Sequence, residues 1–345
     1  MARTNDQKRT ISLKSSFISA AITIVFMYVI YYQGWQSIAA GLCIGFLVPI
    51  GIQVYTEFIY KKYLVRWNLL LVIIINSIAQ LIIIFAIAML FVGIFYMRGN
   101  FEEIFKNYNF LVNRYYQVGI IFGLILSFLF NFFTILENLI GHHILGKLLI
   151  GVYRRPQEVD RVFMFLDIKS STSIAEKIGH LRFMSLVNDF FHDLAEPVRK
   201  SKGEIYKYVG DEAIITWTKK NAISNSNCIR CFLAISDSIQ KKSDYYLKQY
   251  GLVPEFKAGL HGGITVTGEL GYTRREIAFM GDVMNTTSRI EEACKTLHET
   301  LLISHSIATL LQTEGHYTFK EAGKVKLRGK ENDMLLMTLD PSPRK

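Results

Sequence analysis

Cysteine is scarce in this sequence, and its scarcity excludes several kinds of site. The chain of 345 residues holds four cysteines: Cys43, Cys228, Cys231 and Cys294. Cys228 and Cys231 form a C-x-x-C pair, which can bind zinc or carry out redox chemistry. No second Cys or His pair follows at the spacing of a zinc finger, so we expect two reduced thiols in a cytosolic helix.

Acidic residues are fewer than basic ones, and long apolar runs are missing from more than half of the chain. Lysine and arginine total 39 against 29 aspartates and glutamates, a net charge of +10. Such an excess suits nucleic acid or a membrane surface. Much of it flanks the apolar runs, which favours membrane orientation and no nucleic-acid partner. Almost all these runs lie before about residue 150, so we expect one part in the lipid bilayer and one soluble part.

Four segments are expected to cross the membrane, because each reaches or approaches the roughly 20 apolar residues that a span needs. They are, approximately, residues 16–32, 38–60, 69–97 and 117–140. The first could instead be a signal peptide cleaved near residues 37–39, but its length favours an uncleaved span. Asn76 and Gln80 lie one turn apart in the third segment, and we expect such polar groups to find partners across helices.

The soluble part opens with a buried strand over residues 161–166, which ends at Asp167. The turn that follows consists of Ile168, Lys169, Ser170, Ser171 and Thr172. A helix over residues 173–199 comes next, with Ser173 and Glu176 as a capping box. A strand, a short turn and a helix N-terminus can hold a phosphate, and a carboxylate at the end of the strand can hold a divalent cation against it.

A tight β-hairpin supplies a second carboxylate. Residues 203–209 and 212–218 have strand-like patterns and are separated by Gly210 and Asp211 alone. If this hairpin lies beside the first strand, Asp167 and Asp211 meet at one edge of the sheet. Two such carboxylates repel each other unless they share cations, and a triphosphate arrives with Mg²⁺.

A later helix presents an amide and a guanidinium together. It follows an expected strand over residues 276–280. Asn285 and Arg289 are four residues apart and so project from one face of this helix. Such a pair suits a pentavalent phosphorus, where negative charge grows on the oxygens. Near the end of the chain, residues 326–330 offer further cations.

Five motifs therefore follow one another along the soluble part. They are Phe165-Leu166-Asp167-Ile168, Lys207-Tyr208-Val209-Gly210-Asp211-Glu212, Gly259-Leu260-His261-Gly262-Gly263, Gly281-Asp282-Val283-Met284-Asn285 through Arg289, and Leu327-Arg328-Gly329-Lys330. In this order they resemble the catalytic domain of the class III adenylyl and guanylyl cyclases. The resemblance implies an α+β fold with a ferredoxin-like βαββαβ core and additional strands.

The resemblance also implies roles for individual residues. Asp167 and Asp211 match the two metal-binding aspartates, with the backbone carbonyl of Ile168 as a further ligand. Asn285 matches the residue that orients the ribose, and Arg289 the one that stabilises the transition state. The substrate-binding positions are Lys207 and Ala278 at the purine, Lys257 and Arg328 at the phosphates, and Ser170, Ser171 and Thr172 in the turn after the first strand.

The implied reaction converts ATP to 3′,5′-cyclic AMP and pyrophosphate with two Mg²⁺ or Mn²⁺ ions at each site. The ribose 3′-hydroxyl attacks the α-phosphorus. In this family one protomer supplies the metals and the other supplies the purine and transition-state residues. Because the chain holds both sets, the resemblance implies a C2 homodimer with two shared sites. No residue stands out as the general base.

The choice of ATP depends on Lys207, whose ammonium can donate a hydrogen bond to adenine N1. ATP-using members of the family usually add an Asp or Thr where this chain has Ala278. A guanylate or mixed-specificity cyclase is therefore the alternative, although the backbone carbonyls of Ile277 or Ala278 could replace the missing acceptor. A catalytically dead dimeric membrane sensor is a further alternative. A diguanylate cyclase would have Gly-Gly-Asp/Glu-Glu-Phe at the hairpin, which this sequence lacks.

The expected whole is an α-helical transmembrane bundle of four spans followed by the cyclase domain. Its parts are a cytoplasmic N-terminus (1–15), a four-span transmembrane domain (16–141), a helical linker (142–159), a catalytic domain (160–339) and a tail (340–345). The distribution of basic residues predicts a multi-pass protein of the cell (inner or plasma) membrane with a cytoplasmic catalytic domain. The sequence names neither the regulating signal nor the downstream cyclic-nucleotide receptor.

Overall fold

The chain divides into two compact units, residues Met1–Ile140 and Gly141–Lys345. The computed structural model describes residues 151–273, 275–326 and 333–340 of the second unit. In the first unit it describes residues 69–95 and the isolated positions 47, 50, 51, 54, 55, 121, 125 and 129. Each unit is considered by itself.

The first unit contains helix α3, Leu69–Phe95, which covers almost all of the third predicted span. The Tyr55 hydroxyl donates a hydrogen bond to Asn76 Oδ1 at 2.8 Å, and its ring packs against Ile75, Ala79 and Ile83. Asn76 therefore has a partner outside its own helix, as the sequence predicted.

The predicted four-span bundle has no support from the structure. Side chains are described for only part of α3, and the described part of the chain contains no helix with the length and hydropathy of a membrane span. The other three predicted spans lie almost entirely outside the described residues. The four spans therefore stay a prediction.

The second unit is built on a mixed sheet with strand order β2-β3-β1-β4-β6-β8-β7, and β5 pairs with β4 beside this path. The strands are β1 Gln157–Ile168, β2 Glu204–Val209, β3 Glu212–Thr218, β4 Phe256–Leu270, β5 Glu276–Met280, β6 Leu301–Ser304, β7 Phe319–Val325 and β8 Met334–Leu339. Adjacent strands in the order β2-β3-β1-β4 are antiparallel, which confirms the ferredoxin-like core. β4 and β6 are parallel, and the remaining strands extend the sheet.

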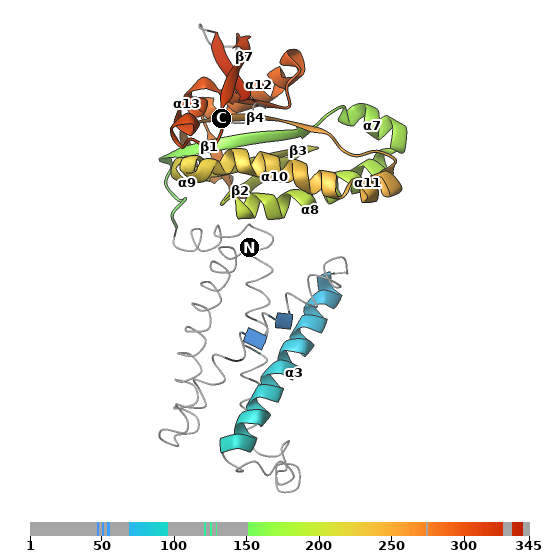
Figure 1. Cartoon of the computed structure of the whole chain (residues 1–345). Helices are drawn as coiled ribbons and strands as arrows, with labels where there is room; N and C mark the ends of the chain where they lie inside the picture. The colour runs from blue at the N-terminus through green and yellow to red at the C-terminus, as the bar shows by residue number, and fades with distance from the viewer. Residues whose placement is uncertain are drawn as a thin grey trace. The chain divides into compact units, whose positions relative to one another are not determined.

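Helices cover the two faces of this sheet (Figure 1). They are α7 Ser171–Ile178, α8 His180–Lys200, α9 Lys219–Ile223, η2 Ser224–Ser226, α10 Asn227–Lys241, α11 Ser243–Tyr250, α12 Asp282–Leu297 and α13 His305–Thr313. The buried side chains of α8 and α10 join the larger core cluster, whereas Val283 of α12 joins a separate cluster with Phe163 and Phe165 of β1. Because strand side chains alternate, α12 packs on the face opposite to α8 and α10.

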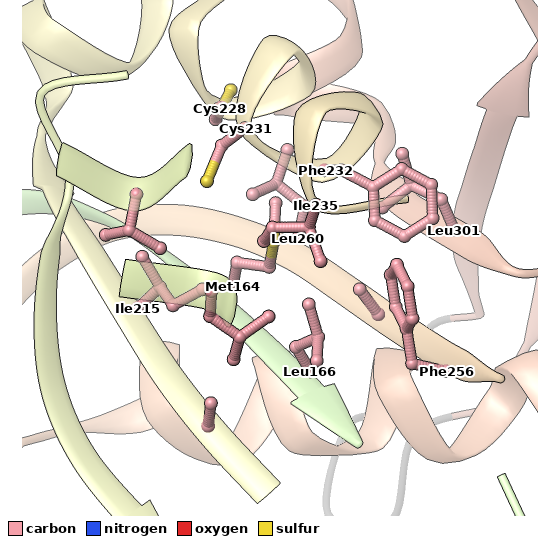
Figure 2. Packing of buried hydrophobic residues seen from close by; sticks show 14 of the residues in the cluster. Met164, Leu166, Ile215, Cys228, Cys231, Phe232, Ile235, Phe256, Leu260 and Leu301 are labelled. Atoms are coloured by element: carbon pink, nitrogen blue, oxygen red, sulfur yellow. The ribbon is translucent and has the colours of Figure 1, made fainter. Parts of the chain in front are cut away.

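The alternation along β1 also decides where its carboxylate lies. Met164 and Leu166 point into the core beneath α10, as Figure 2 shows. The side chain of Asp167 alternates with these and lies on the other face of the sheet, which α12 covers, together with Phe163 and Phe165.

The C-x-x-C pair belongs to this same core. Cys228 and Cys231 of α10 are fully buried in the core cluster of Figure 2, and both are free thiols. Burial raises the pKa of each thiol to about 12, so neither is a reactive thiolate near neutral pH. The interpretation as reduced thiols in a helix is confirmed.

The single helix expected over residues 173–199 is two helices in the structure. Gly179, at φ 84°, separates α7 from α8 in a conformation that glycine adopts without strain. α7 begins at Ser171, and Ser170 is its N-cap without a side-chain capping hydrogen bond. The capping box at Ser173 and Glu176 is therefore wrong, because both residues lie inside the helix.

The expected helical linker also differs from what the structure shows. Residues 151–153 form a turn, and β1 begins at Gln157, three residues before the predicted start of the catalytic domain. Pairing with β4 explains the early start, since Gln157, Glu158 and Val159 are in register with Thr267, Val266 and Thr265. The rest of the predicted linker, residues 142–150, lies outside the described residues.

Candidate active site

The two predicted metal-binding aspartates meet at one end of the sheet. Asp167 is the penultimate residue of β1 and is in register with Glu212 of β3. Asp211 occupies the tight turn between β2 and β3, where Gly210 takes the positive φ of 63° that such a turn requires. Pairing of β3 with β1 therefore brings the turn to the end of β1, as predicted.

The electrostatics of this pair fit a bound cation. Burial raises the pKa of the Asp167 carboxyl, and the nearby charge of Asp211 raises it further. Asp211 Oδ2 is buried and has no hydrogen-bond partner among the described residues. A divalent cation prefers carboxylate oxygens and would satisfy both groups.

The protein side chains alone do not complete a coordination shell. Among the described residues, no group of three or more His, Cys, Asp and Glu side chains could hold a metal ion. The two aspartates would therefore need other oxygens, such as the predicted backbone carbonyl of Ile168 at the end of β1, water or the substrate phosphates.

Lys257 of β4 places a cation beside Asp167. Its ammonium lies 3.2 Å from Asp167 Oδ2 and forms a second, close ion pair with Glu291 of α12. Burial alone would lower the pKa of Lys257, but Glu291 and Asp167 together raise it, so the side chain stays protonated. The predicted contact of Lys257 with substrate phosphates stays a prediction, and the structure adds that this residue offsets carboxylate charge beside the aspartates.

Two glutamates of the site were missed from the sequence. Burial raises the pKa of Glu212 to about 7, and the charges of Glu291 and Asp167 add to the effect. Burial likewise raises the pKa of Glu291 despite its ion pair with Lys257. Glu212 could have been noticed because it directly follows Asp211, whereas Glu291 is placed by the packing of α12 on β4.

The predicted ribose and transition-state residues lie on α12. Asn285 is exposed and Arg289 is half-buried, one turn apart on this helix. The helix begins after Gly281 at φ 138°, close behind the end of β5. The predicted strand followed by a helix is confirmed as β5 and α12. The roles of these two side chains stay predictions.

All but one of the remaining predicted substrate-binding residues are described by the structure. Ser170 is the N-cap of α7, and Ser171 and Thr172 are its first residues, directly after the end of β1. Lys207 is exposed in β2, and Ala278 is buried in β5. Arg328 lies outside the described residues.

Comparison with known proteins identifies the domain that carries this site. The family described as the adenylate and guanylate cyclase catalytic domain matches residues 155–339. A solved structure of a bacterial light-regulated adenylyl cyclase has the same fold, with a TM-score of 0.54 at 20% identity over 64% of each chain.

Curated relatives include both adenylate and guanylate cyclases. The chain is 36% identical over 203 residues to Adenylate cyclase 2 of Rhizobium meliloti (strain 1021), covering 59% of this chain and 56% of the relative. It is 28% identical over 189 residues to Retinal guanylyl cyclase 2 of Bos taurus, covering 52% of this chain and 16% of the relative. The chain thus spans little more than half of the first relative and much less of the second.

Proposed function

Because this chain belongs to the adenylate and guanylate cyclase family through its catalytic domain, we propose that it converts ATP to 3′,5′-cyclic AMP and pyrophosphate. The observation that carries the proposal is the meeting of Asp167 and Asp211 at one end of the sheet, with Asp211 Oδ2 buried and unsatisfied among the described residues. The similarity to Adenylate cyclase 2 supports ATP as the substrate.

We assign each residue of the site a separate role in the reaction. Asp167 and Asp211, with the Ile168 carbonyl, would hold Mg²⁺ or Mn²⁺. When bound, such ions supply Lewis-acid activation of the ribose 3′-hydroxyl and neutralise phosphate charge. Asn285 orients the ribose, and Arg289 stabilises the negative charge that develops on the α-phosphate.

The substrate phosphates would lie against the same end of the sheet. Asp167 and Glu291 already hold the Lys257 ammonium there, so its positive charge is in place before the substrate binds. Ser170 and Ser171 begin α7 next to Asp167, where the N–H groups of a helix start suit an anion.

We further propose that the active form is a homodimer with two shared sites. In this arrangement Asp167 and Asp211 act with Arg289 of the partner subunit. In support, large apolar side chains are exposed in the described part of the single chain, including Leu181, Met184 and Tyr272.

The predicted membrane anchor is also part of the proposal, with the catalytic domain on the cytoplasmic side. Its support is the series of long apolar segments and the distribution of basic residues around them. In α3 the exposed Ile74, Ile78 and Ile82 follow one another at four-residue spacing, which aligns them along one face.

A guanylate or mixed-specificity cyclase is the second candidate. Ala278 offers no side-chain acceptor at the position where ATP-using relatives usually have one, and guanylyl cyclases are among the similar proteins. ATP remains the proposed substrate because an ammonium at Lys207 opposes the N1–H donor of guanine.

Turnover of ATP and GTP by the purified full-length protein tests the proposal. We expect cyclic AMP from ATP in the presence of Mg²⁺ or Mn²⁺, and a loss of about a hundredfold or more in Asp211→Asn. Asp160→Asn is the matched control, since Asp160 lies at the other end of β1 in an exposed ion pair with Lys219 and should leave turnover unchanged. The proposal would be overturned if neither ATP nor GTP gave a cyclic nucleotide with Mg²⁺ or with Mn²⁺.

A further inference from the structure

An open surface pocket of about 480 Å³ lies beside Lys207, the proposed purine-reading residue, and has a carboxylate in its wall. Its lining residues are Lys207 of β2 and Leu270, Gly271 and Glu276 at the β4–β5 hairpin. Lys207 Nζ lies 3.5 Å from Glu276 Oε2, and about half of each side chain is exposed. A donor and an acceptor thus lie side by side in a pocket whose lining also includes the apolar side chain of Leu270.

Neighbouring contacts hold this pair in place. The Phe279 backbone N–H donates a hydrogen bond to the Tyr206 hydroxyl at 3.2 Å. The two rings also meet edge to face, with centroids 5.0 Å apart. Because Lys207 follows Tyr206 and Glu276 precedes Phe279 by three residues, the contact fixes β2 beside β5.

Strand alternation places Glu276 beside the position where the acceptor is missing. Ala278 and Glu276 are two residues apart in β5, so their side chains share one face of the strand. Ala278 is 8% exposed and has no polar atom to offer. Glu276 is the next side chain on that face, and its carboxylate reaches Lys207.

We propose that Glu276 is a specificity-determining residue that accepts a hydrogen bond from the 6-amino group of adenine while Lys207 donates to adenine N1. This inference rests on the proposed cyclase function and names the group that reads the base. The adenine edge carries a donor beside an acceptor, which matches a carboxylate beside an ammonium. Guanine in the same position would place its N1–H donor against Lys207.

The ion pair itself presents little obstacle to the base. Half-exposed ion pairs contribute little to folding stability, so a purine can separate the two side chains at small cost. For the same reason Glu276 can be replaced without unfolding the domain. A change in activity in a Glu276 variant would therefore report on recognition.

The test measures kcat/KM of the full-length protein with ATP and with GTP. Glu276→Ala should lower the value for ATP by roughly tenfold or more, because a hydrogen bond to a charged group is lost, and should change that for GTP by less than about twofold. Glu276→Gln keeps an acceptor oxygen, so its kcat/KM with ATP should lie between those of the wild type and Glu276→Ala. Arg275→Ala is the matched control, since it breaks a neighbouring ion pair with Glu269 in the same hairpin and should leave the ATP-to-GTP ratio unchanged.

A substrate analogue isolates the contact. Purine riboside triphosphate lacks the 6-amino group, so the wild type should prefer ATP over it by roughly tenfold and Glu276→Ala should show little preference. An active wild type whose preference survives in Glu276→Ala would overturn the inference and leave the cyclase function standing. A selective loss of GTP turnover would also overturn it and would assign the carboxylate to guanine. A wild type inactive on both nucleotides would instead refute the proposed function.

Discussion

A β-carbon placed on Gly259 of β4 would lie 2.4 Å from the backbone nitrogen of Glu291 in α12. The strand and the helix therefore approach more closely here than any side chain at position 259 permits. This approach lets the Glu291 carboxylate pair with Lys257, two residues before Gly259. Lys257 in turn pairs with Asp167.

Gly259→Ala should consequently displace α12. We expect a loss of about 1–3 kcal/mol of folding stability from overpacking, together with a large fall in cyclase activity. Thermal unfolding and turnover of the same preparation check both effects. Gly268→Ala in the same strand is the control, because a β-carbon there would meet only ordinary contacts near 3.4 Å. Equal behaviour of the two variants would contradict the close-approach argument.

Lys257→Met should destabilise the domain by removing the cation between two carboxylates. The Lys257 and Glu291 side chains are 17% and 8% exposed, so loss of the lysine leaves a nearly buried charge unpaired, at a cost on the order of 3 kcal/mol. Urea unfolding measures the loss, and adding Glu291→Gln should recover part of it. Arg199→Met breaks the exposed pair with Glu196 and should cost less than about 1 kcal/mol. If Lys257→Met cost no more than this control, the buried charge pairing would not matter for stability.

The thiols of the catalytic domain should be unreactive in the native protein. Cys228, Cys231 and Cys294 are buried, and burial raises the pKa of each to about 12. The reactive thiolate therefore forms only far above pH 8. In a Cys43→Ser background, a colorimetric thiol reagent should detect no rapid reaction at pH 8 and three thiols after unfolding in guanidinium. Rapid native labelling would contradict the buried placement.

Mixed dimers should recover activity from two inactive variants. Asp211→Ala removes a proposed metal ligand and Arg289→Ala removes a proposed transition-state contact. If the sites are shared, one site of a mixed dimer carries both defects and the other is intact. Random pairing makes half of the dimers mixed, which predicts about a quarter of wild-type activity on co-expression. Each variant expressed alone provides the baseline. A mixture no more active than the baselines would argue for sites contained within single protomers.

Local patterns in the sequence were enough to predict much of the domain. Asp167 and Asp211 follow from a strand end and a tight turn, both of which depend on neighbouring residues. The strand over residues 276–280 and the helix carrying Asn285 and Arg289 have the same basis.

Features that depend on contacts distant in the sequence were not predictable in this way. Glu291 reaches Lys257 only because α12 crosses β4 at Gly259, and no spacing in the sequence records that crossing. Glu276 acquires a role only when β5 lies beside β2, a placement fixed by the Tyr206 hydroxyl. The break at Gly179 was missed because apolar periodicity continues on both sides of it.

β1 gives the catalytic unit a particular mechanical property. Its 12 residues run from Gln157 to Ile168, a length of roughly 40 Å, and β4 is paired along all of them while β3 is paired along Arg161–Asp167. From Arg161 to Asp167 the strand is therefore bonded on both edges, and sliding by one residue there would exchange Leu166 with Asp167 between the core and the site. A displacement applied ahead of Gln157 would therefore move Asp167 together with the strands paired to β1. In the homodimer proposed above, we expect an input from the N-terminal side to change the angle between protomers more than the arrangement of residues inside each one.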